Sequence, residues 1–85
     1  MPSYIMQTIV FIEEHYFEKI IAHDLANKLH VGRSTLMTNF KKYTNVTLAD
    51  YITRCRLKNA LILLGEGKKE SEIAERCGFG DVSGF

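Results

Sequence analysis

Residues 23–43 read HDLANKLHVGRSTLMTNFKKY, and this stretch decides the fold. Its apolar side chains recur at three- and four-residue steps on both sides of a turn at residues 30–32, which is the spacing of one helix face. These apolar residues are Leu25, Ala26, Leu29, Leu36 and Phe40. The pattern predicts a short helix over about 23–30, a tight turn, and a second helix over about 33–43.

The same arrangement begins again in residues 70–79. An aliphatic residue and an alanine are followed three positions later by another apolar residue, a turn and one more apolar residue. The repeated positions are Ile73, Ala74, Cys77, Gly78 and Phe79. A small alanine suits two helices that cross closely, so this stretch predicts a second helix-turn-helix unit, of which only the first helix and the turn are complete.

A long helix is expected between the two units, over about residues 47–64. Thr47 is the predicted N-cap, with Asp50 at the third helical position in a pattern like a capping box. Gly65 and Gly67 are expected to end this helix. Together with its apolar residues, this long segment indicates a helix that links the two units.

The N-terminal segment is expected to form a helix over about 4–17, with one apolar stripe made of Ile5, Ile9, Ile12 and Tyr16. Asn45 is the predicted left-handed residue after helix 33–43. The chain is therefore expected to be one all-α, homeodomain-like domain. Its predicted parts are a first subdomain at 1–46, a linker helix at 47–64 and a partial second subdomain at 65–85.

The positive charge is concentrated in the middle of the chain. Residues 32–69 contain eight of the eleven lysines and arginines but only two of the ten acidic residues, a net charge of +6, whereas the whole chain has +1. A neutral total can thus hide a surface that faces phosphate. A solvated helix face would show the same charge pattern, and charge alone does not separate the two.

These features resemble the C-terminal DNA-binding domain of AraC/XylS-type transcription regulators, from about Tyr4 to Phe85. The stretches that carry the resemblance are IEEHY at 12–16, DLA at 24–26, L…FKK at 36–42, YI…RL…A…LL at 51–64 and IA…CGF at 73–79. The resemblance implies two helix-turn-helix units, each placing a recognition helix in one of two successive major-groove segments of double-stranded DNA. It also implies a bacterial activator that contacts RNA polymerase, with an effector-binding or dimerisation domain elsewhere in a longer protein.

This chain departs from the family pattern at several positions. His30 stands where glycine is usual in the first turn, so the turn geometry is expected to differ in detail. Ile21 replaces the Ser or Thr that often caps the second helix, a cap worth about 1 kcal/mol, and Leu48 replaces a proline. Gly84 stands where an aromatic residue is common, and the chain stops at Phe85, inside the second recognition helix.

Helix 33–43 is the expected recognition helix, because its apolar pair points inward and its remaining side chains point outward. An exposed methionine beside small hydroxyl residues fits contact with thymine methyl groups and base edges. The predicted base contacts are Ser34, Thr35, Met37 and Thr38, with Val82 and Ser83 in the second unit. The predicted contacts with the DNA backbone are Arg33, Lys41, Lys42 and Arg56. Two alternatives stay open: the lysines as a solvated charge pair at a helix end, and Arg56 as a structural residue.

The sequence predicts no enzyme, no cofactor and no metal site. It has no Ser/His/Asp or Cys/His set at informative spacing and no glycine-rich phosphate loop, and Cys55 and Cys77 have no metal-ligand spacing. No apolar run is long enough to cross a membrane and no secretion signal is seen, so a cytoplasmic protein with reduced thiols is expected. The alternative function is a helical protein-interaction module, contacting polymerase or a co-regulator, with little DNA binding of its own.

Overall fold

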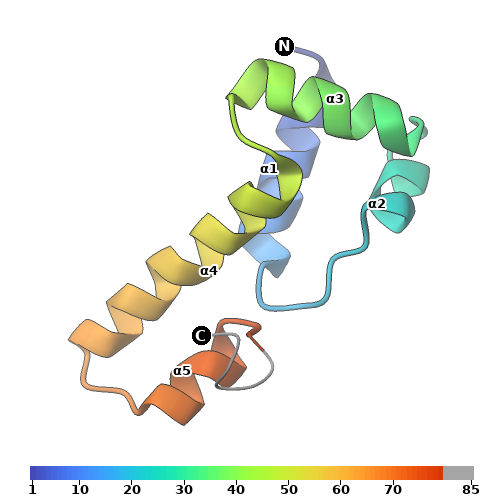
Figure 1. Cartoon of the computed structure of the whole chain (residues 1–85). Helices are drawn as coiled ribbons and strands as arrows, with labels where there is room; N and C mark the ends of the chain where they lie inside the picture. The colour runs from blue at the N-terminus through green and yellow to red at the C-terminus, as the bar shows by residue number, and fades with distance from the viewer. Residues whose placement is uncertain (80–85) are drawn as a thin grey trace.

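A computed structural model describes residues 1–79 of the chain, and residues 80–85 lie outside the described part. Five helices follow one another along these residues (Figure 1). They are α1 (Ser3–His15), α2 (Ala22–Lys28), α3 (Arg33–Thr44), α4 (Leu48–Gly65) and α5 (Glu70–Arg76). All regular structure in residues 1–79 is α-helical, which confirms the predicted all-α fold.

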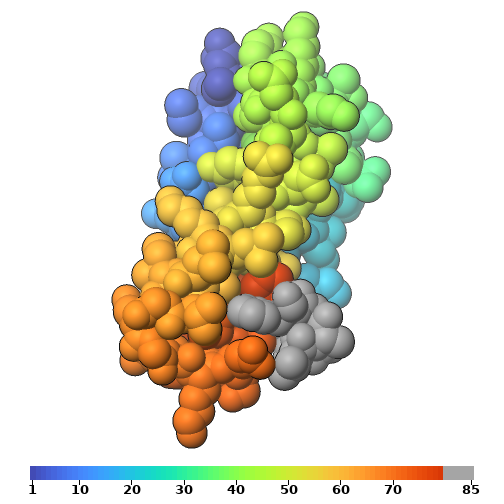
Figure 2. All heavy atoms as spheres, turned by 60° about the vertical axis from the view of Figure 1, so that its left-hand side comes forward, coloured from blue at the N-terminus to red at the C-terminus, as the bar shows by residue number. Residues whose placement is uncertain are grey.

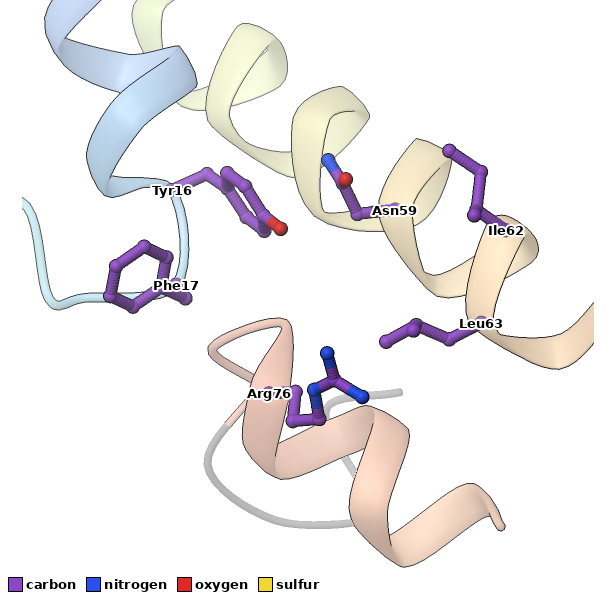
Figure 3. A pocket seen from close by; sticks show the side chains of 6 residues that line it. All are labelled: Tyr16, Phe17, Asn59, Ile62, Leu63 and Arg76. Atoms are coloured by element: carbon purple, nitrogen blue, oxygen red, sulfur yellow. The ribbon is translucent and has the colours of Figure 1, made fainter. Parts of the chain in front are cut away.

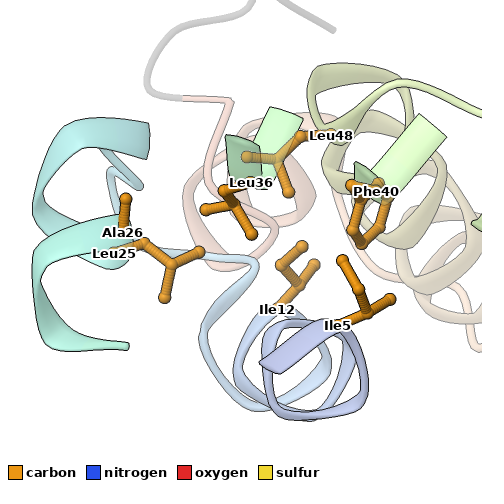
Figure 4. Packing of buried hydrophobic residues seen from close by; sticks show 7 residues of the cluster. All are labelled: Ile5, Ile12, Leu25, Ala26, Leu36, Phe40 and Leu48. Atoms are coloured by element: carbon orange, nitrogen blue, oxygen red, sulfur yellow. The ribbon is translucent and has the colours of Figure 1, made fainter. Parts of the chain in front are cut away.

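The first unit is built around one apolar core shared by α1, α2, α3 and the start of α4. Side chains from all four helices meet there and are almost completely buried (Figure 4). They are Ile5, Ile12, Leu25, Ala26, Leu36, Phe40 and Leu48. Burying a Leu, Ile or Phe side chain contributes about 1.5–3 kcal/mol. The burial of Leu25 therefore outweighs the cap of about 1 kcal/mol that Ile21 fails to supply to α2.

A second, smaller core lies between the C-terminal half of α4 and α5. Ala60, Ile73 and Cys77 are buried in it, and Leu63 and Phe79 pack against it. The molecule is elongated, with extents of 40 × 20 × 18 Å, because α4 runs from the first core to the second. In the space-filling view α5 and the end of α4 form one end of the molecule, and α1 and α3 form the other (Figure 2). The predicted division of the chain into a first subdomain at 1–46, a linker helix at 47–64 and a partial second subdomain at 65–85 stays an interpretation.

The two turns of the internal repeat have the same backbone geometry. His30 has φ 59° and Gly78 has φ 86°, both left-handed. In each turn the amide that follows donates to the carbonyl five residues earlier: Val31 to Ala26 at 3.0 Å and Phe79 to Ala74 at 2.9 Å. This is the hydrogen bond of a Schellman motif. The expectation that His30 would alter the turn is therefore wrong for the backbone, because this exposed histidine adopts the conformation that glycine usually supplies.

The predicted caps of α3 and α4 are confirmed. Asn45 follows α3 with φ 66°, and its amide donates to the Lys41 carbonyl at 2.8 Å. The Thr47 hydroxyl accepts from the Asp50 amide at 3.0 Å, which satisfies one of the free donors at the start of α4. Asp50 adds negative charge to this first turn, where the helix dipole favours it.

α1 and α2 each end two residues before the prediction, α2 at Lys28 and not at residue 30. α1 ends at His15 and not at residue 17, because the Glu18 amide donates to the His15 carbonyl at 2.9 Å and the two side chains pair at 2.7 Å. Tyr16 is thus free to lie between the two cores. α4 ends at Gly65, one residue beyond the predicted end, and the chain turns at Gly67, which has φ 83°, so the prediction that these glycines end the helix is confirmed.

The Thr47 cap gives a stability prediction. Thr47→Ala removes the acceptor for the Asp50 amide and is expected to lower the free energy of unfolding by about 1 kcal/mol. Urea unfolding followed by circular dichroism measures it. Thr53→Ala is the matched control, because Thr53 is exposed within the same helix and caps nothing. Equal losses in the two variants would refute the assignment of Thr47 as the cap.

Candidate nucleic-acid interface

The outer face of α3 carries most of the residues predicted to contact DNA. Leu36 and Phe40 are 0% exposed, so the inner face of the helix is fixed against the first core. The structure places six predicted contact residues on the other sides of the helix, all of them exposed. They are Arg33, Ser34, Thr35, Thr38, Lys41 and Lys42. The structure thus gathers the first-unit candidates, apart from Met37 and Arg56, on one accessible surface.

Met37 differs from its expected environment, because it is half-buried and not exposed. It lines a shallow groove of about 490 Å³ between α3 and the beginning of α4, together with Thr38, Lys41, Lys42, Thr47 and Leu48. The methionine therefore lies beside lysine side chains and next to an apolar wall. A flexible thioether in this position can pack against a methyl group that approaches from outside.

α3 is held in place by polar contacts that sequence reasoning missed. The Asn39 amide donates to the Tyr4 hydroxyl, which ties the middle of α3 to the start of α1. Near the end of α3 the Thr44 hydroxyl donates to the Phe40 carbonyl at 2.6 Å. The Asn39–Tyr4 pair spans 35 residues of sequence, so no local pattern could have found it. The Asn39–Tyr4 bond thus adds a polar tie to the apolar packing that positions α3.

The cations of α3 are available to an external anion. Within residues 1–79 the one ion pair joins His15 and Glu18, so neither Arg33 nor Lys41 has a carboxylate partner there. The Lys42 ammonium lies 5.5 Å from the centre of the Tyr43 ring, a contact that leaves its charge uncompensated. The solvated charge pair considered as an alternative is compatible with this geometry.

Arg56 makes its contacts within the protein. Its Nε donates to the Tyr16 carbonyl at 2.7 Å, and a terminal nitrogen donates to the Glu18 carbonyl at 2.9 Å. Both acceptors belong to the loop after α1. A contact between Arg56 and the DNA backbone stays a prediction that would rely on its remaining donors.

The second-unit candidates, Val82 and Ser83, lie outside the described residues. The same is true of Gly84 and Phe85, the departures noted at the C-terminus. What the structure describes of the second unit ends with its turn.

Two thiols and the half-buried phenol of Tyr51 have shifted pKa values. Burial raises the pKa of Cys55 and of Cys77, so both favour the protonated thiol. Burial, with the hydrogen bond from the Tyr51 hydroxyl to Glu13 at 2.9 Å, raises the pKa of Tyr51 to about 12. Residues 1–79 contain no cluster of three or more potential metal ligands. Within the same range, no helix is long and apolar enough to span a membrane.

Comparisons with known proteins agree with this arrangement. A family model described as a helix-turn-helix domain matches residues 25–85. The chain is 37% identical over 82 residues to an "uncharacterized response regulatory protein" of Staphylococcus epidermidis, which covers 96% of this chain and 33% of that protein. It is 33% identical over 82 residues to the transcriptional regulatory protein HptR of Staphylococcus aureus, covering 96% of this chain and 32% of HptR.

The chain thus spans about a third of the length of the curated relatives it matches. No solved structure matches it significantly. The family match includes most of α2, the turn, α3, α4 and α5, and so covers the helix whose outer face is described above. The chain belongs to the AraC-type helix-turn-helix family of DNA-binding domains.

Proposed function

We propose that this chain binds double-stranded DNA sequence-specifically, with α3 in the major groove, as the DNA-binding part of a transcription regulator. The observation that carries the proposal is the outer face of α3. It presents small polar side chains with cations at both ends of the helix, and its inner face is locked into the core. A helix presented in this way fits the major groove, which is about 12 Å wide.

The cations are spaced to reach both edges of the groove. Arg33 begins α3 and Lys42 lies nine residues later, which is about 13 Å along the axis at the α-helical rise. This separation is close to the width of the major groove. Arg33 would therefore contact a phosphate at one edge, and Lys41 and Lys42 would contact phosphates at the other. Such contacts position the helix and carry no sequence information directly.

The base-reading side chains would be Ser34, Thr35, Met37 and Thr38. Hydroxyl groups donate to or accept from any base edge, whereas the Met37 thioether and the threonine methyls favour the methyl group of thymine. Because Met37 lines the groove beside Thr38, a thymine methyl placed there would be covered by apolar atoms on one side. This arrangement supports a preference for thymine opposite the centre of α3.

The family and the names of two relatives indicate what kind of longer protein this domain would belong to. The names of two relatives describe a response regulatory protein and a transcriptional regulatory protein, each about three times as long as this chain. We infer a cytoplasmic activator that contacts RNA polymerase and that has an effector-binding or dimerisation domain outside this segment. The family resemblance supports both inferences.

A protein-interaction module is the second candidate function, and one observation favours it. The last turns of α4 expose three large aliphatic side chains on one helix face, Leu57, Leu61 and Leu64, which are 43–68% exposed. A patch of this kind marks an interaction surface in many soluble proteins. Binding of a partner there is compatible with DNA binding by α3, and the salt dependence of DNA binding separates the two functions.

The affinity for DNA should fall steeply with salt. A duplex selected from a randomised pool, titrated by fluorescence anisotropy, should give a log K against log salt slope of about −4 if four or five phosphates are contacted. Lys41→Ala with Lys42→Ala is expected to reduce the magnitude of this slope by about 2. Lys19→Ala, an exposed lysine away from α3, is the control and should leave the slope unchanged. No binding to any duplex at about 50 mM salt would overturn the DNA-binding proposal for this chain.

Sequence preference should depend on Met37 and not on Lys41. Met37→Ala is expected to change which sequences are enriched from the randomised pool, with loss of discrimination at one thymine of about 1 kcal/mol or more. Lys41→Ala is expected to weaken all sequences alike. Met6→Ala, an exposed methionine on α1, is the matched control. If Met37→Ala and Lys41→Ala change the enriched sequences equally, the division of roles is wrong.

A further inference from the structure

The loop that follows α1 touches both halves of the molecule. It comprises residues 16–18, and we call the loop, Arg56 and Gly78 together the junction. The Tyr16 side chain packs against the first core and also against the second, so one residue borders both. The loop is the point where the unit that carries α3 meets the unit that carries α5.

Arg56 joins α4 to this loop. Its planar guanidinium donates from Nε and from a terminal nitrogen to two carbonyls two residues apart, those of Tyr16 and Glu18. Those two bonds fix both the distance and the rotation of α4 relative to the end of α1, because a guanidinium presents its donors in a rigid fork. A single-point contact would fix only the distance.

Gly78 joins the second unit to the same loop. A Cβ atom at Gly78 would lie 2.6 Å from the Phe17 carbonyl oxygen and 2.7 Å from the Phe17 Cα. Both neighbours are backbone atoms, so they cannot move aside as a flexible side chain could. The turn after α5 therefore rests directly on the loop after α1. His30, which is exposed at the equivalent position of the first unit, has no such constraint.

An open pocket lies between the two units beside the junction. A cavity of about 370 Å³ opens between the loop, α4 and α5, lined by Tyr16, Phe17, Asn59, Ile62, Leu63 and Arg76 (Figure 3). In this view Tyr16 and Phe17 project from the loop on one side, and Arg76 projects from α5 on the other. Because an open pocket lies beside the junction, the junction contacts and the packing of Tyr16 on the second core are the contacts that align the two units here.

The length of α4 makes this alignment important. α4 packs against the first core from Leu48 to Cys55, and Ala60 in the second core lies about 8 Å further along the helix axis. A tilt of about 10° beyond Cys55 would displace Ala60 by about 1 Å. A displacement of about 1 Å is enough to weaken or break a hydrogen bond, because donor–acceptor distances span only about 0.5 Å.

We propose that Arg56 and Gly78 are positioning residues that hold the second unit at one fixed angle to the unit carrying α3, through the loop at residues 16–18. Their consequence for DNA rests on the proposed function: a fixed angle sets the spacing between the DNA segments that the two units can contact. A rigid joint also raises the effective concentration of the second contact once the first has formed. Arg56 would then affect DNA recognition through the angle between the two units and not through a contact with DNA.

The test measures the relative orientation of the helices in the full 85-residue chain. Backbone N–H residual dipolar couplings are recorded in a neutral stretched gel. In the unsubstituted protein the couplings of α1, α2, α3 and α5 should fit one alignment tensor. In Arg56→Ala the α5 couplings should no longer fit the tensor of the first unit. Arg54→Ala, an exposed arginine two residues away on α4, is the control and should behave like the unsubstituted protein.

Further variants separate positioning from folding. Arg56→Lys keeps one donor group and should restore the common tensor only in part, because it cannot bond both carbonyls with a rigid fork. Gly78→Ala should displace α5 while the α1–α3 couplings stay as they are. A common tensor retained in Arg56→Ala would overturn the proposal. Loss of the α5 amide dispersion in Arg56→Ala would overturn it too, because it would make Arg56 a residue needed for folding.

The outcome is independent of DNA binding. If the chain binds no duplex, the proposed function fails while the tensors still decide the role of the junction. If the chain binds DNA and Arg56→Ala keeps a common tensor, the positioning proposal fails alone. In the selected-duplex assay Arg56→Ala should keep the sequence preference of α3, because the first core does not involve the Arg56 side chain.

Discussion

The packing of Leu36 and Phe40 against Ile5 and Ile12 is the constraint on which the rest of the structure depends. Both α3 residues are completely buried, and no other side chain of α3 is (Figure 4). Since successive helix positions are rotated by about 100°, burying this one pair determines the direction of every other side chain on the helix. The polar outer face, the cations at the two ends and the half-buried Met37 are consequences of that single contact.

The two turns show how one local geometry serves two different surroundings. Both have a left-handed residue followed by the same backbone hydrogen bond, at His30 and at Gly78. His30 is exposed, so a side chain fits there at the modest cost of a left-handed backbone. Gly78 faces the Phe17 backbone, and no side chain fits. The glycine of the second turn is required by the contact between units and not by the turn alone.

The sequence predicted the features that arise from neighbours along the chain. Helical spacing predicted α1 to α4 to within two residues at each end and placed a helix within residues 70–79, and local hydrogen-bonding chemistry predicted the roles of Thr47 and Asn45. It did not predict the partners of Arg56, which lie 38 and 40 residues away. It also placed Tyr16 inside α1 and Met37 in solvent, because Tyr16 packs on residues of α4 and α5, and Met37 is covered in part by Thr47 and Leu48 at the start of α4. Periodicity in the sequence predicts the buried and exposed faces of a helix. The residues that contact each face can be identified only in the folded structure.

The chemistry of the outer face explains why the angle between the units would matter. Serine, threonine and methionine cannot form the bidentate contacts with a base by which arginine or asparagine discriminates strongly. Each such reader adds little specificity, so recognition would depend on several weak contacts formed together. Contacts of this kind are lost when a helix moves by even one hydrogen-bond length. If the proposed readers on α3 contact bases, this chain would therefore gain more from a rigid junction than one whose arginines select bases by themselves.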